Sequence, residues 1–249
     1  MLLTIYFFIT GLIVGSFLNV VIYRLPEEKS IVNPPSHCPH CNNRLKVIDL
    51  VPVLSYLMTG GKCRYCGTGI SIQYPLIELL TAFFFLAAYL NFALSAELFL
   101  ILLLLSALIV ISMIDYKYMI IPNVITYSGI IIGFISAIIF DHISIFDSIL
   151  GIFIPALILL AVALIFKGGM GMGDVKLVAM LGAFLGYKYS LLSIFIGSLV
   201  GSIIGITLMA LGIIERKDRV PFGPLICLGA VIMIFFGEQI INLYFSLFL

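Results

Sequence analysis

Long apolar segments dominate this chain of 249 residues and limit the folds that are open to it. Hydrophobic residues make up 63% of the sequence and charged residues only 10%, which is not the composition of a soluble globular domain. Apolar runs of about 20 residues cross the hydrocarbon core of a bilayer as helices. The composition therefore predicts an all-α polytopic membrane protein with the lipid bilayer as a partner. The near-zero net charge gives no reason to expect a nucleic-acid partner.

About eight segments are predicted to be transmembrane helices. They cover residues 2–24, 73–91, 96–114, 120–140, 146–166, 174–187, 190–214 and 222–248. The sixth is short for a span, so we expect it to be tilted or to lie between protein neighbours. The first segment has no basic residue ahead of its apolar run and no clear cleavage site, and Arg24 follows the run. These features favour a retained span over a signal peptide.

The basic residues predict the orientation of these helices. With residues 25–72 in the cytoplasm and the spans alternating, only Lys188 lies outside. The basic residues placed inside are Arg24, Lys29, Arg44, Lys46, Lys62, Arg64, Lys117, Lys167, Lys176, Arg216, Lys217 and Arg219. Because cytoplasmic loops are enriched in Lys and Arg, this bias predicts that the N-terminus is outside.

Four of the five cysteines lie in the polar module, residues 25–72, as two C-x-x-C pairs. Their spacing is close to that of a zinc ribbon, in which four thiolates surround one ion. We therefore predict a structural zinc site with Cys38, Cys41, Cys63 and Cys66 as ligands. Two redox-active pairs are the alternative. Residues 44–59 of this module are predicted to lie on the membrane surface, with Pro52 interrupting any long helix.

Two aspartates lie at the cytoplasmic ends of predicted spans. Asp115 ends the third span, and Asp174 begins the sixth after a glycine-rich run, residues 168–173. An ionisable group at the membrane is costly, so its presence indicates a function. The structural alternatives are an ion pair between Asp115 and Lys117, and an N-cap role for Asp174.

A pair of aspartates on one face predicts hydrolysis. Two neighbouring carboxylates cannot both ionise easily, so they share one proton. The ionised member can activate water, while the protonated member bonds the carbonyl oxygen of a peptide. Gly171 and Gly173 are expected to let the backbone approach the substrate. Glu78 is a further candidate site residue, and residues 221–224 (Pro-Phe-Gly-Pro) are expected to bend the chain or border the active cleft.

The order and spacing of these motifs resemble one family over nearly the whole chain. The matching stretches are Gly15 to Pro26, the two C-x-x-C pairs, Tyr74 to Glu78, Asp115 with Ile121-Pro122-Asn123, Gly171-Met172-Gly173-Asp174, and Val220 to Pro224. The chain resembles bacterial type IV prepilin peptidases, which are GxGD aspartic proteases that also act as N-methyltransferases.

The resemblance implies a bifunctional enzyme of the bacterial inner membrane. Asp115 and Asp174 would cut the basic leader of type IV prepilins or pseudopilins after a glycine, at the cytoplasmic face. The new N-terminus would then be methylated with S-adenosylmethionine, and Cys38, Cys41, Cys63 and Cys66 would bind Zn²⁺. The regions implied are a first span (1–24), a cytoplasmic zinc module associated with methyl transfer (25–72) and a seven-span peptidase core (73–249). Glu78 is a candidate for binding the methyl donor.

Three other functions remain open from the sequence. A peptidase without methyltransferase activity would keep the aspartates. An ion-coupled transporter would place paired carboxylates near the bilayer midplane and show repeat symmetry. A non-enzymatic scaffold for pilin precursors would keep the cysteines but would not need the aspartates.

Overall fold

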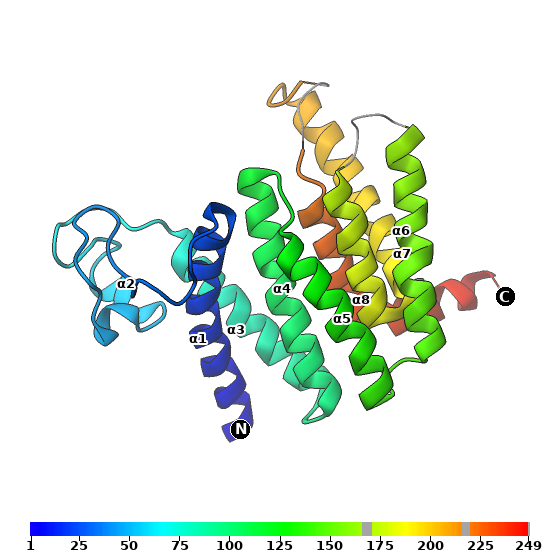
Figure 1. Cartoon of the computed structure of the whole chain (residues 1–249), viewed down its shortest axis with the longest axis horizontal. Coiled ribbons are helices and arrows are strands. Elements are labelled where there is room, and N and C mark those ends of the chain that lie inside the picture. The colour runs from blue at the N-terminus through cyan, green and yellow to red at the C-terminus, as the bar shows by residue number, and fades with distance from the viewer. Residues whose placement is uncertain (166–170, 216–219, 249) are drawn as a thin grey trace. The chain divides into compact units, whose positions relative to one another are not determined.

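The protein is helical throughout the part that the structure describes. A computed structural model describes residues 1–165, 171–215 and 220–248, and the β-structure in these ranges is limited to two isolated bridges. Lys167, Gly168 to Met170, Arg216, Lys217 and Arg219, which entered the sequence argument, lie outside the described residues. The helices are α1 (Leu2–Arg24), α2 (Leu54–Met58), α3 (Gln73–Phe92), α4 (Ala96–Tyr118), α5 (Asn123–Phe140), α6 (Ile145–Ile165), α7 (Met172–Ala210) and α8 (Gly223–Phe248), with 3₁₀ turns η1 (Leu25–Glu27) and η2 (Val47–Leu50) (Figure 1).

The chain forms two compact units, Met1–Val110 and Ile111–Leu249, with the boundary inside α4. Seven of the described helices are long and apolar enough to cross a membrane. Their bounds agree closely with the predicted spans, so the prediction of an all-α polytopic membrane protein is confirmed. The three regions predicted from the sequence (1–24, 25–72 and 73–249) divide the chain by topology rather than compactness, and they remain predictions.

In the first unit, α1 packs closely against α3. If Gly11 carried a Cβ, that atom would lie 2.6 Å from the Cα of Ala82. A Cβ on Gly15 would lie 2.7 Å from the Cα of Glu78. Small residues four apart allow this approach of two membrane helices. The Asn19 side chain donates a 3.1 Å hydrogen bond to the Tyr74 carbonyl near the start of α3. The first turns of α3 are therefore fixed against the last turns of α1.

In the second unit, α7 contacts α5, α6 and α8 (Figure 1). Its approach to α6 depends on two glycines, since a Cβ at Gly182 would lie 1.8 Å from the Gly151 carbonyl oxygen. Its approach to α8 depends on Gly229, where a Cβ would overlap the backbone carbonyl oxygen of Ser193. Glycines at these crossings bring the backbones close enough for van der Waals packing, which drives helix association in lipid.

The chain reverses direction within α7. Gly186 has a φ of 76° and a ψ of 173°, which breaks the helix. Ser190 donates a 3.2 Å hydrogen bond to the Val178 carbonyl, although residues 12 apart in a straight helix are about 18 Å apart. Ser148 and His142 bond the free carbonyls of Ala183 and Phe184 before the break, at 3.0 and 3.3 Å.

The two arms of α7 correspond to the sixth and seventh predicted spans. The first arm, residues 172–185, is about 21 Å long at the α-helical rise, which is less than the hydrocarbon core. Its side chains at Leu177, Val178, Met180, Leu181 and Ala183 are fully buried. The short span therefore lies between protein neighbours, and both arms together with the other six long helices give the eight expected segments.

Candidate active site and zinc centre

Asp115 lies in the last turn of α4 and is only 6% exposed. Its Oδ2 accepts a 2.9 Å hydrogen bond from the backbone N–H of Gly223, which is 108 residues away in the chain. The ion pair with Lys117, which was the structural alternative for Asp115, is absent from the ion pairs of the described residues. The carboxylate is therefore held by backbone rather than neutralised by a cation.

Asp174 lies in the first turn of α7 and is 7% exposed. Its Oδ2 accepts a 3.2 Å hydrogen bond from the N–H of Gly171, the residue that precedes the helix. The sequence analysis considered Asp174 as the N-cap of this helix. Asp174 does cap the helix start, but as the third helical residue, while Gly171 is the N-cap residue. A Cβ on Gly173 would lie 2.9 Å from the Ile121 Cβ, so this glycine lets the start of α7 approach the segment before α5.

The structure brings the two aspartates into one unit, where their carboxylates interact electrostatically. The thiol of Cys227 in α8 lies in the field of both and bonds the Ser112 hydroxyl. Among the described residues neither aspartate has a basic partner. Two buried acids that interact and lack a basic partner disfavour ionisation of both at once.

The sequence indicated Gly223 only within residues 221–224, which were expected to bend the chain or border the active cleft, and the structure places its backbone N–H on Asp115. A Cβ there would lie 2.6 Å from the Asp115 Oδ2 and 3.1 Å from its Cγ. Gly171 differs, because its Cβ would lie at an ordinary 3.5 Å from the Asp174 Oδ2. Only glycine at position 223 can therefore hold Asp115 by its backbone N–H at this distance.

We expect Gly223→Ala to lower leader release by about 100-fold, because losing a hydrogen bond to a buried charged group costs about 1.5–3 kcal/mol and the carboxylate is also displaced. Gly205→Ala, in the second arm of α7 where an added Cβ meets nothing within 4 Å, is the matched control and should keep activity within about threefold. The measurement is the rate at which each purified variant cuts a prepilin, the substrate that the family resemblance implies. Equal rates for both variants would show that the Gly223 contact does not position Asp115.

In the first unit, the four cysteines of the module form one cluster. Their sulfur atoms all lie within 4.8 Å of one another, and the Sγ atoms of Cys38 and Cys66 are 3.8 Å apart. With Zn–S bonds of about 2.3 Å, the edge of a tetrahedral site is about 3.8 Å. The cysteines are free rather than disulfide-bonded. The residues therefore fit the zinc site predicted from the sequence.

The two C-x-x-C loops have the same local structure. In each loop, the carbonyl of the first cysteine accepts a 2.9 Å hydrogen bond from the backbone N–H four residues later. The donor to Cys38 is Asn42, and the donor to Cys63 is Gly67. Both donors have positive φ, 54° at Asn42 and 73° at Gly67, a conformation that Gly and Asn tolerate best. The fold thus brings two equivalent turns to one cysteine cluster.

The ionisation of the cysteines also fits a cation at their centre. The Thr68 hydroxyl and backbone N–H donate to Cys66 and lower its pKa to about 6. The Asn43 N–H lowers the pKa of Cys41, but burial and the sulfurs of Cys38 and Cys66 outweigh it and raise that pKa to about 11. Four thiolates this close need a positive ion, which zinc would supply.

Asp49, which the sequence analysis did not single out, joins the two halves of the module. Its Oδ1 lies 2.8 Å from Arg64 Nε, and its Oδ2 accepts from Tyr65 and from the Lys46 N–H at 2.9 and 3.0 Å. Burial raises the pKa of Asp49, but these donors outweigh it and keep the pKa below its usual value. Arg64 and Tyr65 are the two spacer residues of the second C-x-x-C pair, so the cysteine cluster and η2 are connected.

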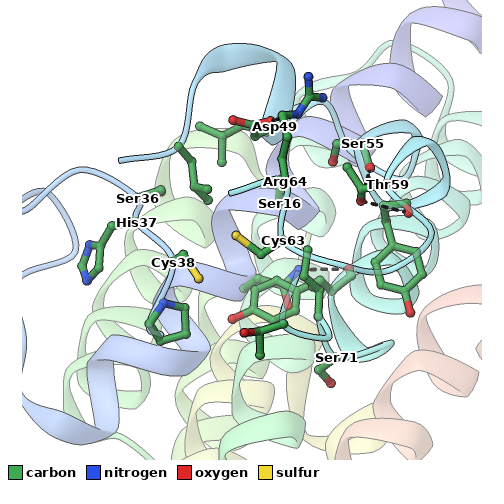
Figure 2. A pocket seen from close by; sticks show the side chains of 18 of the residues that line it. Ser16, Ser36, His37, Cys38, Asp49, Ser55, Thr59, Cys63, Arg64 and Ser71 are labelled. Carbon is green, nitrogen blue, oxygen red and sulfur yellow. Dashed lines mark hydrogen bonds and ion pairs between the residues drawn. The ribbon is translucent and has the colours of Figure 1, made fainter. Parts of the chain in front are cut away.

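A pocket of about 660 Å³ lies beside the cysteine cluster, between the module and the first turns of α3 (Figure 2). Cys38, Cys63, Asp49 and Ser16 line it, as does Glu78, which is 7% exposed. Its volume and mixed lining are those of a small-molecule site. Glu78 Oε2 accepts a 2.7 Å hydrogen bond from the N–H of Val53, and the Ser16 hydroxyl donates to the same carboxylate.

Val53, whose N–H donates to Glu78, is held in a strained conformation. Its φ of 62° and ψ of −50°, with a 2.6 Å bond from the Leu54 N–H to the Pro52 carbonyl, form a γ-turn. A β-branched residue with positive φ is an outlier that persists only when its surroundings hold it. Glu78 is one of those restraints, since it takes the Val53 N–H.

Comparison with known proteins gives one consistent family. Residues 9–92 match the bacterial peptidase A24 N-terminal domain, and residues 102–206 match the type IV leader peptidase family. A prepilin leader peptidase/N-methyltransferase of Bacillus subtilis is 37% identical over 240 residues, which is 96% of this chain and 97% of the relative. Proteins of the same name from Aeromonas hydrophila and Pseudomonas aeruginosa are 33% and 35% identical, over 97% and 94% of this chain and 93% and 90% of their own.

No solved structure matches the chain. The relatives and the two matching regions extend over both compact units and over both candidate sites. The chain therefore belongs to the type IV leader peptidase family.

Proposed function

We propose that this protein cleaves the leader peptide of type IV prepilins or pseudopilins and uses Asp115 and Asp174 to do so. The observation that carries the proposal is the meeting of two buried carboxylates, 59 residues apart in the chain (174 minus 115), with no basic partner among the described residues. The names of the relatives agree with it. A scaffold for pilin precursors would have no need of such a pair.

The proposed cleavage divides two roles between the aspartates. The ionised member takes a proton from water as the water attacks the peptide carbonyl. The protonated member donates a hydrogen bond to the carbonyl oxygen and later gives a proton to the leaving amine. Gly223 and Gly171 would hold the two carboxylates by backbone N–H groups, at 2.9 and 3.2 Å, and leave their remaining oxygens for water and substrate.

The active site is proposed to face the cytoplasm of a bacterium, at the inner membrane. The bias of Lys and Arg toward one side of the helices supports this orientation. The N-terminus would then lie outside. Both aspartates would lie where α4 and the first arm of α7 meet the inner surface, beside the single membrane helix and basic leader of a prepilin.

Orientation gives a labelling prediction. We expect a cysteine introduced at the exposed Leu94, between α3 and α4, to react with a membrane-impermeant maleimide in spheroplasts. A cysteine at Lys117, at the other end of α4, should react only after lysis. The reverse pattern would place the aspartates outside and contradict a cytoplasmic active site.

The second proposed activity is N-methylation of the new N-terminus with S-adenosylmethionine. Support comes from the pocket of about 660 Å³ beside the cysteine cluster and from the N-methyltransferase name of the relatives. Zn²⁺ held by Cys38, Cys41, Cys63 and Cys66 would fold the pocket wall, because four sulfur ligands leave no open position for catalysis.

The test uses the purified full chain in lipid with a prepilin and labelled S-adenosylmethionine. We expect release of the leader and transfer of labelled methyl to the shortened protein. Leader release without methyl transfer would leave a peptidase alone. Absence of both would contradict the proposed function.

A further inference from the structure

Glu78 has a position that leader cleavage leaves unexplained. It is a carboxylate buried in the pocket wall, in a different compact unit from Asp115 and Asp174. The methyl-transfer proposal names the pocket but gives no group to receive the proton that the reaction must remove. The inference below rests on that proposed activity.

Methyl transfer to an amine needs a base. An α-amine has a pKa of about 7.7–8.0, so at pH 7 most of it is the ammonium ion, which has no lone pair. The ammonium must lose a proton before nitrogen can attack a methyl group. A base within reach of the bound amine therefore raises the rate.

The other acid in the pocket is already engaged. Asp49 is bound by the Arg64 guanidinium, the Tyr65 hydroxyl and the Lys46 N–H. Glu78 accepts from the Val53 N–H and the Ser16 hydroxyl and has no ion-pair partner in the described ranges. The remaining titratable or charged groups that line the pocket are Tyr23, Arg24, His37, Cys38, His40, Tyr56, Lys62, Cys63 and Tyr74.

None of those groups combines the position and the chemistry of Glu78. The Arg24 guanidinium donates to the Ser30 and Pro34 carbonyls at 2.9 and 2.7 Å, and it is a cation. His37 is exposed and bonds the Pro35 carbonyl. Cys38 and Cys63 belong to the zinc cluster. Glu78 is therefore the pocket carboxylate available to an incoming cation.

Its depth also suits the substrate. Glu78 lies five residues after the first residue of α3, which is about 7.5 Å along the helix. The new N-terminus of a cut substrate begins the apolar segment of that substrate and so lies near the membrane surface. A carboxylate just below the surface can meet this amine without the segment leaving the bilayer.

We propose that Glu78 binds the new N-terminal ammonium group and accepts its proton during methyl transfer. The proton passes from nitrogen to a carboxylate oxygen of Glu78. The freed lone pair on nitrogen forms the N–C bond as the C–S bond of the sulfonium donor breaks, and that electron pair stays on sulfur. The products are the methylated ammonium ion, which keeps the positive charge that the sulfonium brought, and S-adenosylhomocysteine with a neutral sulfur, with one proton on Glu78. The Val53 and Ser16 bonds hold the carboxylate for this role.

The test compares Glu78→Gln with the unmodified full chain in lipid, at pH 7 and pH 9.5. Gln keeps an oxygen for the Val53 N–H but cannot take a proton. At pH 7 we expect methyl transfer to fall by about 100-fold or more, with leader release retained as the measure of folding. At pH 9.5 the amine is already neutral, so the deficit should shrink to less than about tenfold.

Two further measurements separate a base from a structural residue. Calorimetric affinity for S-adenosylhomocysteine should be unchanged in Glu78→Gln, because the variant alters the amine side of the pocket. Asp49→Asn removes a carboxylate that Arg64, Tyr65 and the Lys46 N–H already hold, so it disturbs the module and should show the same deficit at both pH values. A Glu78→Gln deficit that is absent at pH 7, or equal at both pH values, would overturn the inference. A native chain that releases leader but transfers no methyl would contradict the proposed methyl transfer, and this inference with it.

Discussion

Replacing either Asp115 or Asp174 with Asn is expected to lower leader release by at least about 1,000-fold, the largest effect we predict for a single side chain. Each carboxylate supplies either the base or the acid of the proposed cleavage, and acid–base groups contribute about 100- to 10,000-fold each. Asn keeps an oxygen that can accept from Gly223 or Gly171, so the backbone contacts at 2.9 and 3.2 Å can persist. The loss is therefore one of chemistry rather than folding.

The matched control is Asp147→Asn, in the first turn of α6 of the same unit. It makes the same chemical change away from the pair and should keep activity within about twofold. The double variant should be no slower than either single variant, because residues that act as a unit are not additive. If Asp115→Asn and Asp174→Asn both still cut a prepilin at rates near the unmodified protein, the aspartate pair is not the peptidase site.

The membrane helices could be predicted from the sequence because hydrophobic length is a local property. α1, α3 and α6 begin and end within one residue of the predicted bounds. From the sequence, the reversal at Gly186 could be predicted only as the short gap between the sixth and seventh apolar segments. One glycine with positive φ makes the turn there, and its support comes from Ser148 and His142, which are distant in the sequence.

The candidate site was less predictable, because its contacts join distant segments. The charge bias placed both aspartates at one face, and the structure brings them together. Nothing near Gly223 in the sequence indicates that its N–H reaches Asp115 across 108 residues. Asp49 likewise resembles an ordinary charged residue of a surface segment until the fold sets it against Arg64 and Tyr65. Clustering of the four cysteines is confirmed, and their role as zinc ligands stays a prediction.

Replacement of Cys38 with Ser is the second large effect that we expect, on metal content and methyl transfer rather than on cleavage. Cys38 is buried in the cluster, and a four-thiolate zinc site contributes several kcal/mol to the folding of a small module. Losing one ligand should release the zinc and expose residues 25–72 to protease. Methyl transfer should fall below detection, because the pocket wall depends on the cysteine turns and on the Asp49 contacts with the second turn.

Leader release should survive in part, because Asp115 and Asp174 belong to the other compact unit. Cys227→Ala is the matched control, since Cys227 is buried in α8 and lies outside the cluster. Its zinc content should equal that of the unmodified protein by elemental analysis. Full zinc in Cys38→Ser would rule out the four-thiolate site. A wall built on Cys38 and Cys63 is not expected to keep its shape when its central ion is gone, so loss of zinc with methyl transfer intact would instead show that the metal does not support the pocket.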